Sequence, residues 1–249
     1  MKHRKRKKNR RTSRKRLGEL SLQDIGEKSI PILEKKLAQD PNSAELHNHL
    51  ATAYLLQDAY EKAVFHLEKV RDLDPEYPSL DVRLSTAYMV LQKFPEAKAV
   101  ASVALERRSC DQTDKLHYIL GRVCIQLSEY EAALSHFQTA LDLGIEDAAR
   151  KDAAEIDINF ELGHTYLLLN KFDLAHEHFQ KALAQTPDKS FLHASVALLY
   201  MKQGDIDAAE PYLIEALMLD PECSTAQRVL EVFNEERENQ STPDETEAL

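Results

Sequence analysis

Apolar residues recur every three or four positions along most of the chain, and polar turn-forming residues interrupt them at short intervals. Between Phe160 and Leu183, apolar or small side chains follow helical spacing on both sides of the turn Leu169–Asp173. This spacing predicts two amphipathic helices joined by a short turn. Only six of the 249 residues are Gly, which argues against a turn-rich β sandwich or barrel. The pattern therefore predicts an all-α fold.

The same marker residues return at a fixed interval. Tyr54 and Tyr88 are 34 residues apart, and Gly121 and Gly163 are 42 apart, which equals one interval plus an insertion of eight. A fixed period of this length is typical of repeat architectures in which each unit is one helical hairpin. The other pairs at 34 residues are Ala63 and Ala97, Tyr166 and Tyr200, Ala175 and Ala209, Ala182 and Ala216, and Pro187 and Pro221.

The register of these markers divides the chain into five repeats. We place them at 44–77, 78–111, 114–147, 156–189 and 190–223. The insertion 148–155 contains neither Gly nor Pro, so it either extends the first helix of the fourth repeat or is a simple length variant.

Both flanks of the array resemble partial units. Segment 17–43 is interpreted as a half repeat, because Ile30, Leu33 and Leu37 form one stripe that predicts a second helix without a full first helix. Segment 224–238 carries a narrow apolar stripe and is expected to cap the last core face, which an open array of repeats requires. That stripe consists of Ala226, Leu230 and Phe233.

The fourth repeat carries the motif Leu162-Gly163-His164-Thr165-Tyr166, followed by Ala175, Phe179, Ala182 and Pro187. This sequence resembles the signature of the tetratricopeptide repeat (TPR) family. Other repeats depart locally, with Ser85 in place of the Gly and Cys124 in place of the Tyr. The resemblance implies a right-handed α-solenoid of stacked antiparallel helix pairs, and a non-enzymatic function in protein binding.

In the TPR family the first helices line a concave groove that binds peptides or helices. By position, this resemblance implies a mostly apolar groove here, which would suit an amphipathic helix or hydrophobic peptide. Tyr118, Phe160, Leu167 and Phe191 are our expected anchors, and we expect about half of the groove residues to pack in the core. The groove residues are Asn48, Thr52, Leu55, Val82, Thr86, Met89, Lys115, Tyr118, Arg122, Ile125, Asp157, Phe160, His164, Leu167, Phe191, Leu198 and Met201.

Charge is distributed unevenly along the chain. Segment 1–16 has eleven basic residues and no acid, whereas the remainder has a net charge of −21. Such an arm is expected to be disordered when free, as is the acidic tail 239–249. The arm is a candidate for sequence-blind contact with nucleic acid or anionic lipid; the alternatives are a solubilising role or folding onto the acidic surface of the protein itself. Its basic residues are Lys2, Arg4, Lys5, Arg6, Lys7, Lys8, Arg10, Arg11, Arg14, Lys15 and Arg16.

Motifs for catalysis or cofactor binding are not evident in the sequence. The three Cys residues are too widely spaced for a metal knuckle, and neither a phosphate-binding loop nor a Ser-His-Asp arrangement is evident. We therefore expect no enzyme activity, no metal or cofactor, and no small-molecule substrate. The longest strongly apolar run, Val196–Met201, is too short to span a membrane. We expect a cytoplasmic protein, or a nuclear one if the source is eukaryotic, that is neither secreted nor transmembrane.

Three functions are consistent with this pattern. The leading hypothesis is a protein-interaction scaffold that holds a partner segment in the groove. The first alternative is a self-assembling scaffold, in which the half repeat 17–43 leaves an apolar face that docks on a second copy as a homo-oligomer. The second alternative is an adaptor that uses the basic arm to bind nucleic acid or an anionic membrane.

Overall fold

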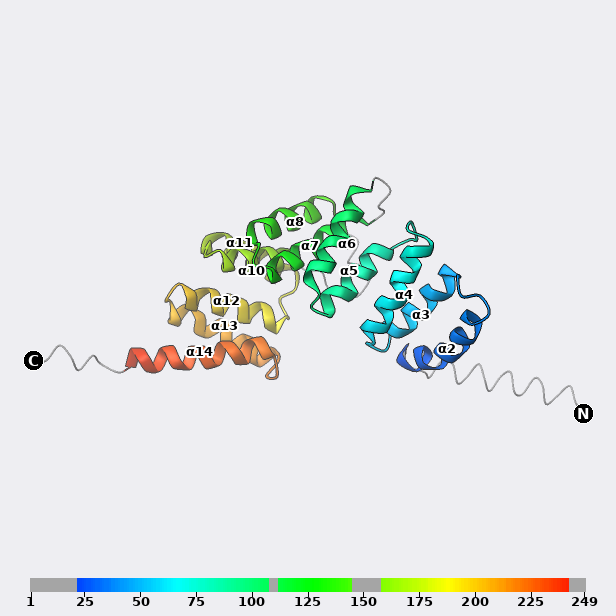
Figure 1. Cartoon of the computed structure of the whole chain (residues 1–249). Coiled ribbons are helices and arrows are strands. Elements are labelled where there is room, and N and C mark those ends of the chain that lie inside the picture. The colour runs from blue at the N-terminus through cyan, green and yellow to red at the C-terminus, as the bar shows by residue number, and fades with distance from the viewer. Residues whose placement is uncertain (1–21, 108–111, 145–157, 242–249) are drawn as a thin grey trace, which may run out of the picture. The chain divides into compact units, whose positions relative to one another are not determined.

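The computed structural model describes residues 22–107, 112–144 and 158–241 (Figure 1). In these ranges the chain forms α-helices and no strands, so the all-α prediction is confirmed. The helices group into two compact units, one ending at Gln112 and one beginning at Thr113. Across the described part of the chain, no helix is long and apolar enough to cross a membrane.

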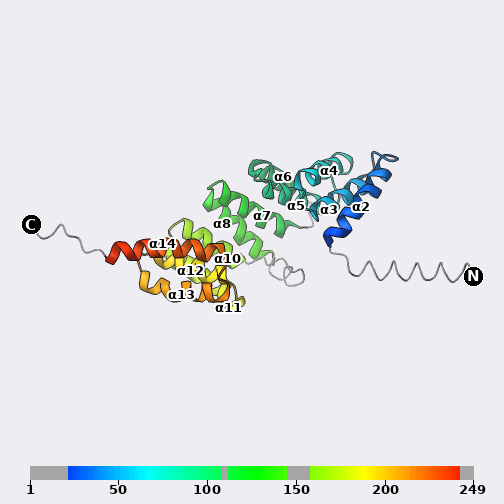
Figure 2. The ribbon, with the colours of Figure 1, turned by 90° about the horizontal axis from the view of Figure 1, so that it is seen from below.

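The N-terminal unit consists of one leading helix and two antiparallel hairpins. Helix α2 packs on α3, α3 pairs with α4, and α5 pairs with α6, while α4 and α5 join the two hairpins (Figures 1 and 2). Each pair stacks on the next, as the repeat pattern predicts. The helices are α2 (Leu22–Leu37), α3 (Ala44–Leu55), α4 (Tyr60–Leu73), α5 (Leu80–Val90) and α6 (Phe94–Glu106).

The C-terminal unit contains three hairpins and a final helix. Helices α7 and α8, α10 and α11, and α12 and α13 form the pairs, and α14 packs against α12 and α13 (Figure 1). Their bounds are α7 (Thr113–Gln126), α8 (Tyr130–Asp142), α10 (Ile158–Leu168), α11 (Phe172–Gln185), α12 (Ser190–Lys202), α13 (Ile206–Leu219) and α14 (Ser224–Ser241).

Each hairpin turns at one residue in the left-handed backbone region. The N–H group of the following residue donates to the carbonyl five positions earlier, as from Lys171 to Tyr166 at 2.9 Å. This geometry ends a helix by satisfying its last carbonyls. Because only one of the five turn residues is Gly, the turn is imposed mainly by the packing of the two helices. The residues are Asp58, Gln92, Ser128, Asn170 and Gly204, with φ from 54° to 80°.

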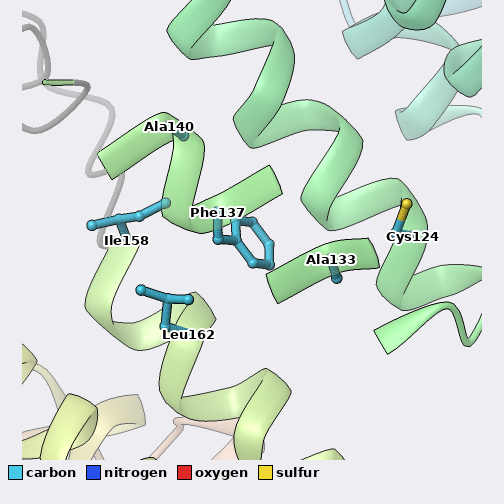
Figure 3. Packing of buried hydrophobic residues seen from close by; sticks show 6 residues of the cluster. All are labelled: Cys124, Ala133, Phe137, Ala140, Ile158 and Leu162. Atoms are coloured by element: carbon cyan, nitrogen blue, oxygen red, sulfur yellow. The ribbon is translucent and has the colours of Figure 1, made fainter. Parts of the chain in front are cut away.

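Small residues on first helices allow the two helices of a pair to approach closely. Gly121 of α7 lies against the ring of Phe137 of α8, so that a Cβ atom at Gly121 would be 2.5 Å from Phe137 Cε1. Phe137 is fully buried in a cluster with Ile158 and Leu162 of the next first helix, α10 (Figure 3). The hairpin core and the contact between hairpins are thus one continuous apolar layer.

The apolar stripe that we predicted on the leading helix α2 packs within the chain. Ile30, Leu33 and Leu37 pack against the buried cluster that contains Leu50 and Tyr54. The Tyr54 hydroxyl also donates to Glu34 of α2 at 3.0 Å. These three residues therefore contact α3 of the same chain, and the self-assembly hypothesis stays a prediction.

The final helix α14 covers the end of the last hairpin. Ala226, Val229 and Phe233 are buried, whereas Leu230 is only partly buried. The apolar stripe that we predicted did not include Val229, which lies on the same face of α14. The helix extends to Ser241, so three residues that we assigned to the tail are helical. Segments 1–16, 148–155 and 242–249 lie outside the described residues, and the predictions about them stay predictions.

Candidate functional site

The first helices of the C-terminal unit, α7, α10 and α12, carry most of the predicted groove residues. Helix α10 contacts both α7 and α12, because each hairpin stacks on the next with its first helix beside the neighbouring first helix. Side chains on one face of these three helices are therefore brought together, although they are far apart in the sequence.

Three ring side chains form the centre of this surface. Phe160 and Phe191 meet edge to face with ring centroids 5.0 Å apart, and His164 stacks on Phe160 at 6.0 Å. All three are only partly buried. We call this set the aromatic face. Burial lowers the pKa of His164 below its ordinary value, so its imidazole is neutral at pH 7.

A polar network lies next to the aromatic face. The Tyr118 hydroxyl donates to Glu161 at 3.2 Å, and Arg122 Nε lies 3.5 Å from the same carboxylate oxygen. Burial and the nearby Glu161 carboxylate both raise the pKa of Tyr118, which keeps the phenol protonated. The Arg122 guanidinium lies 5.9 Å from the Tyr118 ring. Glu161 thus holds two predicted groove residues in place, although it is not itself among the predicted residues and directly follows Phe160 in the sequence.

The structure separates surface residues from core residues within the predicted groove. Leu167, one of our four expected anchors, has 1% of its surface exposed and packs with Phe179, so it belongs to the core. Leu198 and Met201 are partly buried and pack against the apolar cluster formed by residues of α12, α13 and α14. Lys115 and Ile125 are also partly buried. Asp157 lies outside the described residues.

Two of the predicted groove residues of the N-terminal unit, Asn48 and Thr52, contact an arginine. Arg83 of α5 donates through Nη1 to Asn48 Oδ1, and through Nη2 to Thr52 Oγ1 at 2.8 Å. The hydroxyl of Thr52 in turn donates to the carbonyl of Asn48 at 3.0 Å. Both acceptors are among the predicted groove residues, whereas Arg83, which directly follows Val82 in the sequence, is not.

The other groove residues of this unit are less polar. Leu55, Val82 and Met89 are partly buried. Thr86 is also partly buried, and its hydroxyl donates to the carbonyl of Val82 at 2.7 Å. Among the described residues there is no group of three or more His, Cys, Asp or Glu side chains that could hold a metal ion.

Sequence profiles described as tetratricopeptide repeat match residues 44–77, 112–188 and 166–231. Among curated proteins, the chain is 29% identical over 111 residues to "Anaphase-promoting complex subunit CDC16" of Saccharomyces cerevisiae. It is 35% identical over 89 residues to "Protein KINESIN LIGHT CHAIN-RELATED 2" of Arabidopsis thaliana. The matches cover 45% and 35% of this chain, but only 13% of the length of each relative.

Solved structures show the same fold at low sequence identity. The structure of PilW, a type IV pilus biogenesis factor, aligns with a TM-score of 0.68 at 17% identity, covering 84% of this chain and 91% of PilW. YrrB, described as a TPR protein with an unusual peptide-binding site, aligns with a TM-score of 0.59 at 20% identity, covering 80% of this chain and 97% of YrrB. Because the three profile matches together extend over more than half of the sequence, and the stacked hairpins agree with them, the chain belongs to the tetratricopeptide repeat family.

Proposed function

We propose that the chain is a non-enzymatic interaction scaffold that binds a segment of a partner protein on the aromatic face. Proteins of this family bind protein partners. The observation that carries the proposal is that Phe160 contacts both His164 and Phe191, while all three rings remain only partly buried. Aromatic side chains, including Phe, are enriched at protein interfaces relative to the rest of the surface.

The chemistry of the aromatic face favours an apolar or amphipathic partner segment. Burying the remaining apolar surface of Phe160 and Phe191 contributes about 25 cal/mol per Å² before the entropic cost of association. His164 adds ring surface without a charge, because burial already keeps its imidazole neutral at pH 7. A partner can therefore cover it without desolvating an ion.

Polar contacts at the rim would set the orientation of the partner. The side chain of Arg122 is 46% exposed although it lies beside Glu161. Its guanidinium has further N–H donors for a carbonyl or carboxylate of the partner. An amphipathic helix that places apolar side chains over the rings and polar ones toward Arg122 would satisfy both parts of the surface.

The curated relatives support this function at a coarse level. CDC16 is described as a subunit of a complex, which is the role expected of a scaffold. The matched segment is a small part of that relative, so its partners are not transferred to this chain.

The proposal is tested by replacing both phenylalanines on the surface. Peptides are selected from a phage-displayed library for binding to the intact chain, and their affinities are then measured for the double variant Phe160→Gln, Phe191→Gln. We expect the double variant to lose at least tenfold in affinity, since each anchor contributes about 1 to 2 kcal/mol or more. Hydrogen exchange of the wild-type complex should show new protection in α10 and α12.

The matched control is Phe65→Gln, which changes an aromatic side chain that is 55% exposed on α4. Circular dichroism checks that every variant keeps its helices. If the selected peptides bind the double variant as tightly as the wild type, or if they protect only helices other than α7, α10 and α12, the aromatic face is not the binding site.

A further inference from the structure

Helix α13 has an apolar stripe that is exposed to solvent. Residues Asp207, Pro211, Ile214 and Met218 follow one another at intervals of four, three and four positions, which places them on one face of the helix. All four are exposed, and the exposed fraction is 51% for Ile214 and 75% for Met218. The opposite face, which includes the buried Leu213, packs in the cluster shared with α12 and α14. We call the exposed stripe the outer face of α13.

The two large apolar side chains of the outer face lie one helical turn apart. Single exposed apolar residues are common on protein surfaces, whereas neighbouring ones indicate an interaction site. The Met218 side chain is unbranched and polarisable, so it adapts to the shape of an apolar partner surface. Ile214 and Met218 together can therefore cover apolar side chains that a partner helix presents at the same spacing.

The charge around the outer face has one sign. Segment 203–227 contains six acidic residues and no Lys or Arg, whereas segment 158–202 contains four of each. Asp207, Glu215 and Glu222 are exposed. Within residues 22–107, 112–144 and 158–241, none of these three carboxylates forms an ion pair. Such a surface repels phosphate groups and attracts a cationic partner.

We propose that the outer face of α13 docks a cationic amphipathic helix of a partner protein. Leucine-like side chains of that helix cover Ile214 and Met218, and its lysine or arginine side chains lie beside Asp207 and Glu215. Apolar contact supplies affinity, and the complementary charges select the partner and its orientation.

The basic arm 1–16 matches the outer face in charge alone. Met1 is its only large apolar residue, so the arm cannot cover both Ile214 and Met218. A partner helix satisfies the apolar and the charged part together. The outer face is also carried by a different helix from the aromatic face, whose residues lie on α10 and α12, so this inference does not rest on the proposed function.

The probe is a capped peptide of about 15 residues, built from leucine and lysine as an amphipathic helix, and compared with a peptide that has glutamate in place of lysine. The intact chain is labelled at its methionine methyl groups, and nuclear magnetic resonance follows the Met218 signal, which is assigned from its loss in Met218→Leu. We expect a saturable shift with the lysine peptide only. Its affinity should fall as salt is added, because salt screens exposed charges.

Two sets of variants separate the apolar from the charged contribution. Ile214→Gln should lower the affinity read at Met218 about tenfold. The double variant Asp207→Asn, Glu215→Gln should lower it as well and remove most of its salt dependence. The matched control Leu143→Gln changes another apolar side chain of the same unit, 51% exposed, and should leave the titration unchanged.

The aromatic-face variant Phe160→Gln, Phe191→Gln should also leave the Met218 titration unchanged, so a failure of one proposal is distinguishable from a failure of the other. The inference is overturned if the peptide binds while the Met218 signal stays in place, or if the glutamate peptide shifts that signal equally. It is also overturned if, without peptide, the signal moves on dilution or on deletion of residues 1–16. A second copy or the basic arm then occupies the outer face.

Discussion

At the scale of single residues, side-chain volumes are complementary in four of the five helix pairs that the structure describes; in the second repeat, Ser85 is followed 16 positions later by the small Ala101. Where the first helix has Gly121 or Gly163, the facing residue 16 positions later is a fully buried phenylalanine. Where the first helix has Ala, the residue 16 positions later is Leu. Interiors packed at the density of organic crystals require this complementarity. The pairs of the second kind are Ala51 with Leu67 and Ala197 with Leu213, all buried.

Replacing Gly121 by Ala is expected to lower the free energy of unfolding by about 1 to 3 kcal/mol. The added Cβ would lie 2.5 Å from Phe137 Cε1, so the ring or the helix must shift. Urea denaturation followed by circular dichroism measures the loss. An unchanged unfolding midpoint would show that the hairpin relaxes at no cost.

Adding Phe137→Leu to the Gly121→Ala variant should recover part of that loss. The pair would then have the Ala and Leu combination of the first and fifth repeats. Phe137→Leu alone leaves a cavity and also destabilises the fold. A double-mutant cycle should therefore give a combined loss smaller than the sum of the two single losses; simple additivity would contradict the volume match.

At the scale of helices, the carbonyl of a proline between repeats accepts a hydrogen bond from the side chain of the residue six positions later. His47 contacts Pro41 O at 3.2 Å, and Gln227 donates to Pro221 O at 2.9 Å. The sixth residue after Pro75 is Asp81, whose carboxylate has no hydrogen to donate to the Pro75 carbonyl. Arg107 donates to Pro75 O instead, and it also pairs with Asp81. A second residue thus replaces the missing donor.

The proline contact also fixes how two histidines bond across the first hairpin. His47 Nδ1 and His66 Nδ1 are 2.9 Å apart. Because His47 Nε2 faces the Pro41 carbonyl, the neutral His47 ring has its proton on Nε2 and accepts at Nδ1. His66 is then the donor. His117 and His136 repeat the arrangement at 3.0 Å in the third repeat.

These histidines should make the fold sensitive to acid. Burial and the neighbouring His47 lower the pKa of His66 from 6.5 to about 4, although Glu34 of α2 opposes them. Between those pH values the unfolded chain takes up a proton that the folded chain does not. The free energy of unfolding is therefore expected to fall as the pH decreases from 6.5 toward 4, and this contribution is constant above 6.5. Urea midpoints measured across this range test it.

His47→Asn should retain most of the stability at pH 7.5 and weaken the acid dependence. The fourth repeat already has an Asn and a His at the corresponding positions, where Asn159 Oδ1 contacts His178 Nδ1 at 3.1 Å. An asparagine oxygen can accept from His66 without placing a second imidazole beside it. An acid slope equal to that of the wild type would show that the His47–His66 pair is not its source.

At the scale of the whole molecule, the two units are built from local contacts between neighbouring hairpins. Stability in such arrays is close to a sum of units and nearest-neighbour interfaces. Helix α14 supplies the last interface through Phe233, which is 5% exposed, and Arg237, which pairs with Glu210 of α13 at 2.7 Å.

Phe233→Ala is expected to destabilise the C-terminal unit by about 3 kcal/mol. Hydrogen exchange should become faster in α12, α13 and α14, which share its cluster, while exchange in α3 and α4 stays unchanged. Equal acceleration in both units would show that the chain unfolds as one cooperative body.

The uneven charge of the chain also belongs to this scale. If the basic arm binds phosphates, deleting residues 1–16 should abolish binding of the chain to a single-stranded RNA oligonucleotide. The affinity of the intact chain should fall steeply with salt, because each neutralised phosphate releases a counterion. Salt-independent binding, or binding retained after the deletion, would argue against the arm.

The fold class was readable from the sequence because helical hairpins depend on local periodicity. Repeated Tyr, Ala and Gly markers predict the helix pairs, and the Leu162–Tyr166 motif resembles the family to which the chain belongs. Such patterns act over a few turns of helix, where neighbours in sequence are neighbours in space.

The makeup of the candidate sites was decided by the tertiary structure. Position within a repeat does not reveal that Leu167 is buried while Phe160 stays partly accessible, since burial depends on how the next hairpin stacks. Arg83 and Glu161 gain their roles from side chains on other helices, 31 to 43 positions away in sequence. The sequence by itself determined which helices form, whereas only their packing determined which side chains stay accessible and which charges remain without a counterion.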